Sequence, residues 1–475
     1  MDCCGRKDGR GRHYDLAVIG AGSAGFSAAL AGAEQGAQVA LIGHGLIGGT
    51  CVNVGCVPSK RLIRAVETLH QARSASRFQG IQGDAEVKDW RAVIRQKDEL
   101  VSGLRQAKYV DLLPAHNSIT YIEGKARVLD GGVEVSGEFI QVGKAIITTG
   151  ARAAIPTIPG IDSVPYLTST TALELEELPR SMIVVGGGYI GAELAQAFAR
   201  SGVRVTIVFR SRLLPQAEPE IGAALTSYFE AEGTSVIGEV QYGSVHSTAS
   251  GVALEVIREG RSQMLEGERL LVAVGRRPNT EELGLTELGV ALTANGGIIV
   301  DDRMRTTRQG LYAAGDVTGR DQFVYMAAHG ARVAAENALN GDSRRYDRAG
   351  MPSVVFTDPQ VASAGVTEAE ARAQGHQVVS TVLSLDQVPR ALAAADTRGL
   401  IKLIAERDTG KLLGAHILAP EGCDSIQTAV LAIRHGMTFR QLAETIFPYL
   451  TTVEGLKLAA LSFEKDVTAL SCCAS

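Results

Sequence analysis

The sequence is poor in the features that mark secreted, membrane-spanning and nucleic-acid-binding proteins. Its seven cysteines are too sparse in 475 residues for a secreted disulfide framework. No stretch approaches the roughly 18 consecutive apolar residues of a membrane span, and no dense stripe of Lys and Arg accompanies the net charge of −5. The charged N-terminal segment lacks an apolar signal core. We therefore expect a cytoplasmic protein that binds neither nucleic acid nor a membrane.

The remaining composition is typical of a globular α/β protein. Hydrophobic residues make up 45% of the chain, charged residues 21% and aromatic residues only 5%, and the 54 glycines indicate many tight turns. At about 150 residues per domain, this length predicts roughly three domains.

A strand, a glycine-rich turn and a helix follow one another near the N-terminus. The apolar run YDLAVIG at residues 14–20 leads into GAGSAG and an alanine-rich segment, and QVALIG completes a βαβ unit near Gly43. Gly20, Gly22 and Gly25 form G-x-G-x-x-G, in which backbone amides and the helix N-terminus hold a pyrophosphate. This first motif predicts a dinucleotide site.

The same pattern returns in SMIVVGGGYIGAELAQAFARSG, which begins at Ser181. Its second motif consists of Gly186, Gly188 and Gly191. One such motif is a moderate signal, but two copies in the correct context are poorly explained as ordinary tight turns. The fold class we predict is therefore α/β with two Rossmann-like dinucleotide-binding domains.

The acidic residue that normally binds a ribose hydroxyl about twenty residues after such a motif is missing from both units. Arg210 and Arg212 follow the second motif and suit a 2′-phosphate, which favours NADPH over NADH. The alternative is that they are solvated surface arginines. Gly43 and His44 follow the first motif, and the sequence leaves open what replaces the acid there.

The segment GGTCVNVGCVPSK at residues 48–60 carries a cysteine pair beside the first motif. The four residues between Cys51 and Cys56 exceed the C-x-x-C zinc spacing, and no further ligands stand nearby. If the segment is the first turn of a helix, the two sulfurs approach closely enough for a strained, reducible disulfide, and the helix dipole favours a thiolate. We therefore expect a redox-active pair.

A second pair, Cys472 and Cys473, consists of adjacent residues in the tail. Adjacent Cα atoms lie about 3.8 Å apart, shorter than the roughly 4.4 to 6.8 Å of a relaxed disulfide. This pair is better suited to a soft metal ion. Cys423 stands alone, and we expect it to be a small core residue.

The cysteine segment, the two nucleotide units and LYAAGD at residues 311–316 together resemble the flavin-dependent disulfide oxidoreductase family over essentially the whole chain. The resemblance implies FAD in the first unit, NADPH in the second, and an α+β C-terminal domain that forms a homodimer with shared active sites. The expected domains are an FAD-binding domain at 1–150, an NADPH-binding domain at 151–275, the second part of the FAD-binding domain at 276–345, and an interface domain at 346–475.

The same resemblance assigns roles to individual residues. It places Thr50 and Lys60 on the flavin. It also places Ala126 near the adenine of FAD, and Asp316 and Val324 near the ribityl chain and ring. It also implies that Lys60 pairs with Glu193 beside the flavin and that Tyr189 gates the nicotinamide pocket.

Members of the family that reduce lipoamide or glutathione disulfide carry a His and then a Glu in H-P-x-x-x-E, where the His protonates a thiol leaving group. This chain reads FPYLTTVE. Glu454 matches the Glu, but Tyr449 occupies the His position, and a phenol with a pKa near 10 is a poor general base. We therefore expect slow reduction of a disulfide substrate.

The tail LSCCAS, together with TDPQVA and VPRALAAADTRG, is similar to the branch of the family that reduces thiol-bound Hg(II). The resemblance implies that Cys472 and Cys473 of one subunit pass Hg(II) to Cys51 and Cys56 of the other, with Cys56 facing the flavin. Two further residues match proposed neutral helper ligands, although both could be ordinary packing aromatics: Tyr109 and Tyr449.

Many members of this branch begin with a small metal-capture domain that bears C-x-x-C, and we read this chain as the catalytic core without it. Cys3 and Cys4 are either a substitute capture pair or nonfunctional. Two other hypotheses are a reductase of small disulfides and a flavoprotein that sequesters metal without turnover. The intact nucleotide motifs argue against storage, which needs no NADPH.

Overall fold

A computed structural model describes residues 13–469, so Cys3, Cys4, Cys472 and Cys473 lie outside the described residues. The chain forms two compact units. Unit 1 comprises the residues up to Pro58, Gln96–Ala154 and Arg276–Asp347, and unit 2 comprises Ser59–Arg95, Ile155–Gly275 and the residues from Arg348 onward. Two helices begin in one unit and end in the other, α3 (Cys56–Arg73) and α4 (Trp90–Arg105). The four-part domain division expected from the sequence stays a prediction.

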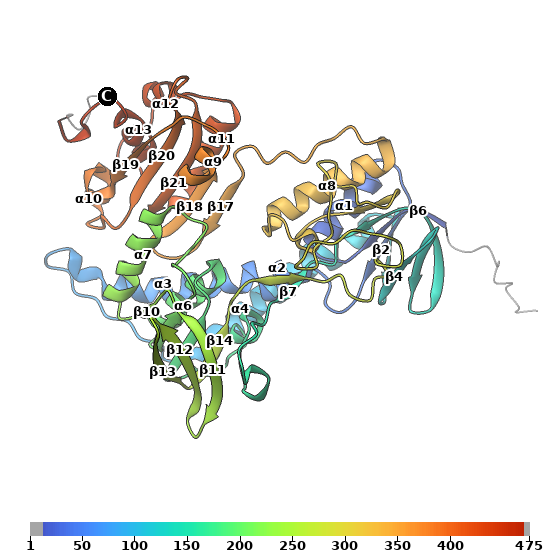
Figure 1. Cartoon of the computed structure of the whole chain (residues 1–475), viewed down its shortest axis with the longest axis horizontal. Helices are drawn as coiled ribbons and strands as arrows, with labels where there is room; N and C mark the ends of the chain where they lie inside the picture. Colours follow the sequence, from blue (N-terminus) through green and yellow to red (C-terminus); the bar gives the residue numbers. More distant parts are fainter. Residues whose placement is uncertain (1–12, 470–475) are drawn as a thin grey trace, which may run out of the picture. The chain divides into compact units, whose positions relative to one another are not determined.

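Unit 1 is built on a seven-stranded sheet with the order β3-β2-β1-β6-β5-β4, in which β16 also pairs with β6. Its strands are β1 (His13–Ile19), β2 (Val39–Gly43), β3 (Ile119–Glu123), β4 (Ala126–Leu129), β5 (Gly132–Val135), β6 (Glu138–Ile147) and β16 (Leu311–Ala313). β1, β2, β3, β6 and β16 are parallel, and β4 and β5 extend the sheet as an antiparallel hairpin. In Figure 1, α1 (Ser23–Glu34) and α8 (Val324–Asn340) lie side by side against this sheet.

In unit 1, β2 and the Leu16–Ile19 part of β1 are continuous apolar runs because both faces of the sheet are covered there. Leu16, Ala17 and Val18 in β1 are fully buried, as are Ala40 and Leu41 in β2. The predicted βαβ unit is therefore present with the expected strands.

Two short strands that flank the second nucleotide unit in the sequence pair within unit 1. There β7 (Ala151–Ala153) and β15 (Arg276–Pro278) pair as a two-stranded antiparallel ribbon. The shorter elements of unit 1 are α2 (Gly49–Val54), a π-helical turn at Gln106–Val110, and 3-10 turns at Leu113–Ala115 and Asp316–Thr318.

Unit 2 contains the second nucleotide fold. Its parallel sheet has the order β10-β9-β8-β14. An antiparallel sheet of β11, β12 and β13 is inserted in the sequence between β10 and β14. The strands are β8 (Ser181–Val185), β9 (Arg204–Val208), β10 (Ser235–Ile237), β11 (Gln241–Thr248), β12 (Gly251–Arg258), β13 (Arg261–Gly267) and β14 (Arg269–Val272). The helices are α5 (Ser169–Ala172), α6 (Tyr189–Arg200) and α7 (Pro219–Ala231).

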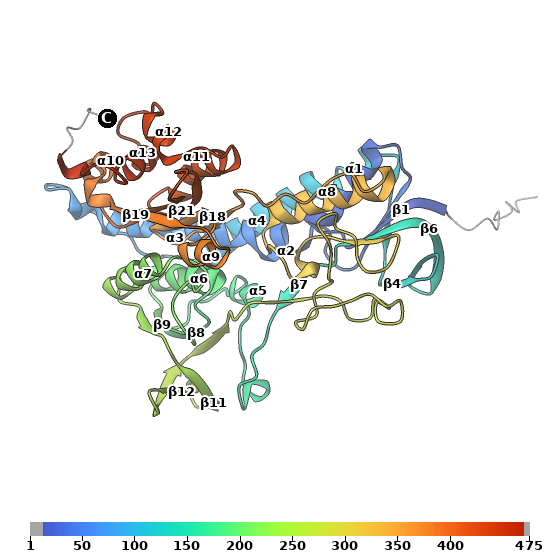
Figure 2. The ribbon, with the colours of Figure 1, turned by 45° about the horizontal axis from the view of Figure 1, so that its top comes forward.

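The C-terminal part of unit 2 is a five-stranded antiparallel sheet with the order β17-β18-β21-β20-β19. Its strands are β17 (Pro352–Val355), β18 (Gln360–Gly365), β19 (Val378–Ser384), β20 (Leu400–Glu406) and β21 (Leu412–Ala419). The helices are α9 (Glu368–Ala373), α10 (Pro389–Ala393), α11 (Gly422–Arg434), α12 (Phe439–Glu444) and α13 (Glu454–Leu461). Figure 2 shows α6 and α7 between this sheet and the sheet of β8 and β9.

The face of the C-terminal sheet toward α6 and α7 carries a polar row in an apolar surround. Val355, Val361 and Leu418 belong to the core cluster that includes α6 and α7. Directly opposite one another across β17, β18, β21 and β20 stand Ser353, Ser363, His416 and Lys402. Opposite residues of antiparallel strands share a face, so these four side chains form one row, which we call the polar row.

A membrane-spanning helix is not found between residues 13 and 469, where each helix is too short or too polar to cross a bilayer.

Candidate functional site

The first glycine motif shapes the start of α1 in unit 1. A Cβ on Gly25 would lie 1.7 Å from the carbonyl oxygen of Gly20, so only glycine lets this helix begin so close to β1. Gly20 also has φ +119°, a conformation that favours glycine. Gly22 is the N-cap residue of α1, and a Cβ on Gly49 at the start of α2 would lie only 2.6 Å from its Cα. These loops leave backbone amides at a helix N-terminus, which fits a dinucleotide pyrophosphate.

The second motif repeats this construction in unit 2. A Cβ on Gly191 would lie 2.0 Å from the carbonyl oxygen of Gly186, which has φ +121°. Gly188 is the N-cap residue of α6, and a Cβ there would meet no atom within 4 Å. The space in front of this helix is therefore open, as a bound pyrophosphate requires.

The two arginines after the second motif lie in different surroundings. Arg212 donates to the carbonyl oxygens of Leu214, Pro215 and Ala217, with Nη–O distances of 3.4, 2.8 and 2.6 Å. Arg210 is exposed just beyond the end of β9. Arg212 thus supports its own loop, whereas the guanidinium of Arg210 is positioned to reach an anion in solvent.

Asp316 lies at the start of a 3-10 turn in unit 1 and faces Arg276 of β15. The Nε atom of Arg276 lies 3.4 Å from Oδ2 of Asp316, and its Nη2 atom lies 3.4 Å from Oγ1 of Thr50 and also donates to Ala151. Burial raises the pKa of Asp316, and the guanidinium of Arg276 opposes this rise. A partly buried acceptor held in this way suits a sugar or ribityl hydroxyl. Two other predicted flavin residues begin elements of the same unit, Ala126 in β4 and Val324 in α8.

The two cysteines lie on two consecutive helices rather than on a single helical turn. Cys51 lies within α2 and is partly buried, whereas Cys56 is exposed and begins α3. Gly55 ends α2 between them, where a Cβ would lie 2.8 Å from the carbonyl oxygen of Thr50. The expected helical context is present but broken at Gly55. Cys56 occupies a helix N-terminus, where the dipole favours a thiolate.

Tyr109 lies in the π-helical turn of unit 1, a geometry that is frequent at functional sites. Its hydroxyl is 3.1 Å from Oγ of Ser23, in the first glycine motif, and its ring packs edge-on against Phe26 with centroids 4.9 Å apart. Burial raises the pKa of Tyr109, the hydrogen bond to Ser23 lowers it, and charge on Cys51 and Cys56 raises it. The net effect is upward, so unit 1 brings a neutral phenol to the cysteine pair.

Lys60 and Glu193 meet in unit 2, with Nζ 2.7 Å from Oε2. A third residue, Phe356, contacts both partners. Its backbone N–H donates to Oε1 of Glu193 at 2.9 Å, and its ring centroid lies 4.8 Å from the Lys60 ammonium. Cys423 is nearby, and burial raises its pKa to about 12, so this thiol stays protonated at neutral pH.

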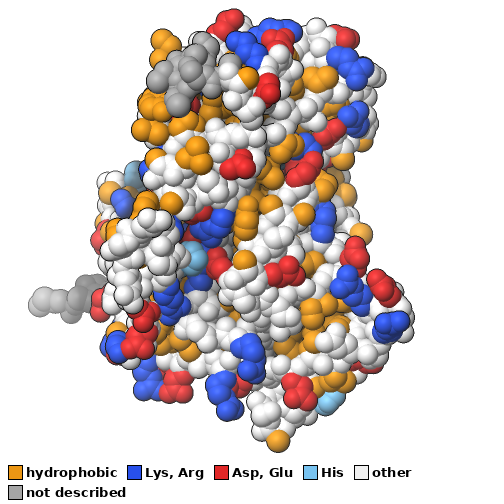
Figure 3. Space-filling model, turned by 90° about the vertical axis from the view of Figure 1, so that its left-hand side faces the viewer, with side chains coloured by type: hydrophobic (Ala, Val, Ile, Leu, Met, Phe, Trp, Pro, Cys, Tyr) orange, Lys and Arg blue, Asp and Glu red, His pale blue; other side chains and the backbone are white. Residues whose placement is uncertain are grey.

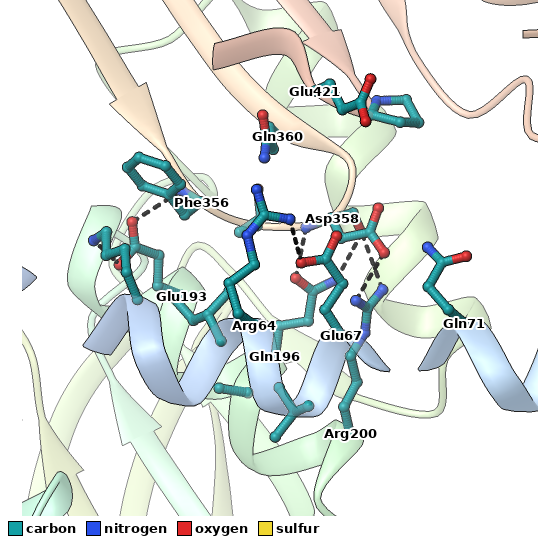
Figure 4. Close-up of a pocket in the computed structure, with 16 residues that line it drawn as sticks. Arg64, Glu67, Gln71, Glu193, Gln196, Arg200, Phe356, Asp358, Gln360 and Glu421 are labelled. Carbon is teal, nitrogen blue, oxygen red and sulfur yellow. Dashed lines mark hydrogen bonds and ion pairs between the residues drawn. The ribbon is translucent and has the colours of Figure 1, made fainter. Parts of the chain in front are cut away.

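A pocket of about 190 Å³ lies beside this pair in unit 2 (Figure 4). Figure 4 shows Arg64 and Glu67 of α3 paired with each other, and Gln196 and Arg200 of α6 reaching Asp358. Gln196 both donates to the backbone oxygen of Asp358 and accepts from its N–H, each at 2.8 Å. These polar groups bond to one another, and the contacts of Gln196 and Arg200 with Asp358 join α6 to the C-terminal sheet.

Tyr189 is the first residue of α6, and its hydroxyl lies 3.3 Å from Oγ of Ser353 on β17. Tyr449 is 47% exposed, and Glu454 begins α13, where its carboxylate accepts from the backbone N–H of Leu450 at 3.2 Å. Cys472 and Cys473 lie outside the described residues. Between residues 13 and 469, no group of three or more His, Cys, Asp and Glu side chains is arranged to hold a metal ion.

Large exposed hydrophobic side chains are frequent in the C-terminal part. Figure 3 shows hydrophobic side chains gathered over the upper part of the face it presents. The exposed set in this part of the chain is Val382, Leu392, Leu431, Ile446, Tyr449 and Leu450. Ile446 is 94% exposed, an unusual position for such a side chain.

Several residues of the site carry no recognisable signal in the sequence. Phe356 contacts Glu193 across 163 positions, and Ser23 contacts Tyr109 across 86. Arg276 lies in the segment GRRPN, in which the proline is the only signal of local structure. The contacts of these residues depend on tertiary packing, which no local pattern encodes.

Comparison with known proteins gives matches along nearly the whole chain. Residues 14–335 match the family described as pyridine nucleotide-disulphide oxidoreductase, and residues 351–460 match its dimerisation domain. The mercuric reductase of Streptomyces lividans is 45% identical over 470 residues, covering 97% of this chain and 98% of the relative. The mercuric reductase of Shigella flexneri is 46% identical, covering 100% and 85%. The solved HOCl-induced flavoprotein disulfide reductase RclA from Escherichia coli matches with a TM-score of 0.83 at 31% identity, covering 95% and 100%.

Proposed function

Because the chain belongs to the pyridine nucleotide-disulphide oxidoreductase family, we propose that it is an NADPH-dependent flavoprotein that reduces thiol-bound Hg(II) to Hg(0). The observation that carries this proposal is the similarity to mercuric reductases along nearly the full length of both chains. In the overall reaction, NADPH and Hg(II) give NADP+, a proton and Hg(0). Bound FAD supplies the relay for the two electrons.

The nucleotide-binding residues divide between the two glycine motifs. Gly20, Gly22 and Gly25 would hold the FAD pyrophosphate at the start of α1, with Asp316 accepting from a ribityl hydroxyl. The equivalent residues for NADPH would be Gly186, Gly188 and Gly191. Thr50, Ala126, Val324 and Lys60 would complete the flavin site, and Arg210 would contact the 2′-phosphate.

The thiols supply soft ligands for the metal. Cys56 and Cys51 would bind Hg(II) as a two-coordinate dithiolate, because a third thiolate would stabilise Hg(II) against reduction. Tyr109 stays protonated at neutral pH, since burial and the neighbouring thiolates raise its pKa. It would therefore assist as a neutral oxygen donor, as would Tyr449.

We propose that two copies share each site. The matched dimerisation domain and the exposed hydrophobic set of the C-terminal part support a homodimer. In this arrangement Cys472 and Cys473 of one subunit capture Hg(II) and exchange it onto Cys51 and Cys56 of the other. Cytoplasmic residence stays a prediction.

The test is Hg(II)-dependent NADPH oxidation by the FAD-loaded protein, with volatile Hg(0) collected. We expect turnover that depends on the metal, and its loss in Cys56→Ser. A Cys472→Ala, Cys473→Ala double variant should retain reduction of FAD by NADPH but lose most mercury turnover. Absence of mercury-dependent oxidation in the unaltered protein would refute the proposal.

Subunit sharing is tested by complementation. Homodimers of Cys56→Ser subunits and of Cys472→Ala, Cys473→Ala subunits should each have little or no mercury turnover, but their heterodimer contains one complete site. Random assembly of equal amounts should restore about a quarter of the normal rate, because half the dimers are mixed and each has one intact site. No restoration would show that each site is built from a single subunit.

A second candidate function is reduction of a small disulfide. The match to the solved flavoprotein disulfide reductase RclA favours it, and Tyr449 at the usual His position opposes it. Assays with lipoamide and glutathione disulfide should give little turnover. A rate on either substrate that exceeds the mercury rate would make this the better assignment. Mercury binding without NADPH oxidation would instead indicate sequestration.

A further inference from the structure

The polar row of the C-terminal sheet meets the second nucleotide site at Tyr189. Oη of Tyr189 lies 3.3 Å from Oγ of Ser353, and Oγ of Ser353 lies 2.9 Å from Oγ of Ser363. Ser353 and Ser363 stand directly opposite each other in the antiparallel pair of β17 and β18. Three hydroxyl groups therefore form a continuous hydrogen-bonded chain from the sheet to the first residue of α6.

We propose that Ser353, supported by Ser363, is a positioning residue that holds the Tyr189 ring across the path of the nicotinamide and thereby sets the affinity for NADPH. This inference rests on the proposed function, in which α6 begins the NADPH site. It adds two serines of the C-terminal sheet to the determinants of nucleotide binding.

The position of Tyr189 on α6 explains why its ring matters. Gly188, with open space before it, receives the pyrophosphate, and Glu193 pairs with Lys60 about one turn after Tyr189. A nucleotide that extends from the pyrophosphate site toward the Lys60–Glu193 pair must pass Tyr189. A ring fixed to Ser353 therefore stands in the way and has to move.

The serines are suited to fixing the ring because they contribute hydroxyls and little else. Each hydroxyl donates one hydrogen bond and accepts others, so the chain is complete in either direction. The neighbours of the pair on the same sheet face, Val355 and Val361, are buried and apolar. A phenol that leaves Ser353 finds no equivalent hydroxyl on these two side chains.

The expected effect follows from the strength of one neutral hydrogen bond, which corresponds to about a 2- to 10-fold change in an equilibrium. When only a fraction of molecules is competent to bind, the apparent Kd is raised by the inverse of that fraction. Removing the Ser353 hydroxyl removes this restraint on the ring and increases the competent fraction. Ser353→Ala should therefore tighten NADP+ binding by about 2- to 10-fold.

The experiment is calorimetric titration of the FAD-loaded dimer with NADP+, in a double-mutant cycle. Ser353→Ala and Tyr189→Phe should each lower the Kd, and the double variant should show no further gain, because both changes remove the same hydrogen bond. Ser353→Thr keeps the hydroxyl and should restore the original Kd. Ser363→Ala should give a smaller change in the same direction.

The matched control is Ser380→Ala, which removes a hydroxyl from β19 of the same sheet, where Ser380 bonds to Glu368 at 2.9 Å. Its Kd should equal that of the unaltered protein. An unchanged Kd in Ser353→Ala, or an equal gain from Ser353→Ala in the Tyr189→Phe background, would overturn the proposal. No mercury enters this titration, so its outcome is independent of the turnover assays above.

Discussion

Arg210 and Arg212 show how two residues of one type, two positions apart, take different roles. Arg212 donates hydrogen bonds to three backbone carbonyls of the loop at 214–217, whereas Arg210 is exposed. From the sequence, both arginines were equally suited to contact the 2′-phosphate. The hydrogen bonds of Arg212 give it a supporting role in this loop, so we propose Arg210 as the contact of the 2′-phosphate.

Arg210→Met should weaken NADPH binding selectively. A hydrogen bond to a charged group contributes about 1.5 to 3 kcal/mol, so the KM for NADPH should rise roughly 10- to 100-fold with little change for NADH. Arg212→Met should instead raise both values and lower the thermal midpoint, because the loop loses its support. Steady-state kinetics with both nucleotides distinguish the two variants, and equal losses for NADPH and NADH in Arg210→Met would contradict the assignment.

Phe356 contacts both members of the Lys60–Glu193 ion pair. Phe356→Leu removes the ring beside Lys60 but keeps the backbone hydrogen bond to Glu193. A cation–π contact contributes about 0.5 to 2 kcal/mol, and we expect the midpoint of thermal unfolding to fall by about 1 to 4 °C. Phe356→Tyr retains the ring and serves as the control; identical midpoints for the two variants would contradict a role for the ring.

At the scale of elements, a buried ionic cluster joins α3 and α6 to the C-terminal sheet. Arg200 lies 2.6 Å from Glu232 and 2.8 Å from Asp358, and Arg398 also contacts both carboxylates. His70 of α3 faces this cluster. Burial lowers the pKa of His70, the two arginines lower it further, and the two carboxylates oppose them.

This arrangement predicts a loss of stability in mild acid. Because the folded-state pKa of His70 lies below its ordinary value near 6.5, the unfolded chain takes up a proton first as the pH falls through 6.5. Stability is therefore retained above that pH and declines below it. His70→Gln should flatten the fall in unfolding midpoint between about pH 7 and 5; the exposed His435→Gln is the control, and equal pH profiles would exclude His70 as the cause.

The predictable elements are those whose signal is local. Continuous apolar runs predicted β1, β2 and β8, and glycine spacing predicted the starts of α1 and α6. The helix break at Gly55 was not foreseen, because it depends on how closely the residue approaches Thr50. The pairing of β7 with β15, which joins segments more than a hundred residues apart, also depends on the tertiary fold.

At the scale of the whole molecule, the exposed hydrophobic set of the C-terminal part is matched by a recognised dimerisation domain. Ile446 is nearly fully exposed, so a charge placed there costs the isolated subunit little. In a symmetric dimer the same substitution enters the interface twice. Its effect on association is therefore expected to exceed its effect on folding.

Ile446→Asp should weaken dimerisation by about 100-fold or more, since each copy brings an unpaired charge to an apolar surface. Sedimentation velocity at micromolar concentration should then detect monomers, with mercury turnover falling in parallel. Leu46→Asp places the same charge on a side chain that is 67% exposed in unit 1 and should leave the dimer intact. Dimers that persist in Ile446→Asp would exclude this residue from the interface.

The break at Gly55 gives the cysteine pair an adjustable span. A disulfide holds its sulfurs about 2.05 Å apart, whereas two thiolates on opposite sides of one metal ion stand much farther apart, at about twice a metal–sulfur bond of roughly 2.3 Å. A pair on one rigid helix could not serve both distances without unwinding it. Because Cys51 lies within α2 and Cys56 begins α3, rotation at Gly55 between the two helices changes the distance between the sulfurs. The same two side chains can therefore alternate between a disulfide bond and the binding of a metal ion.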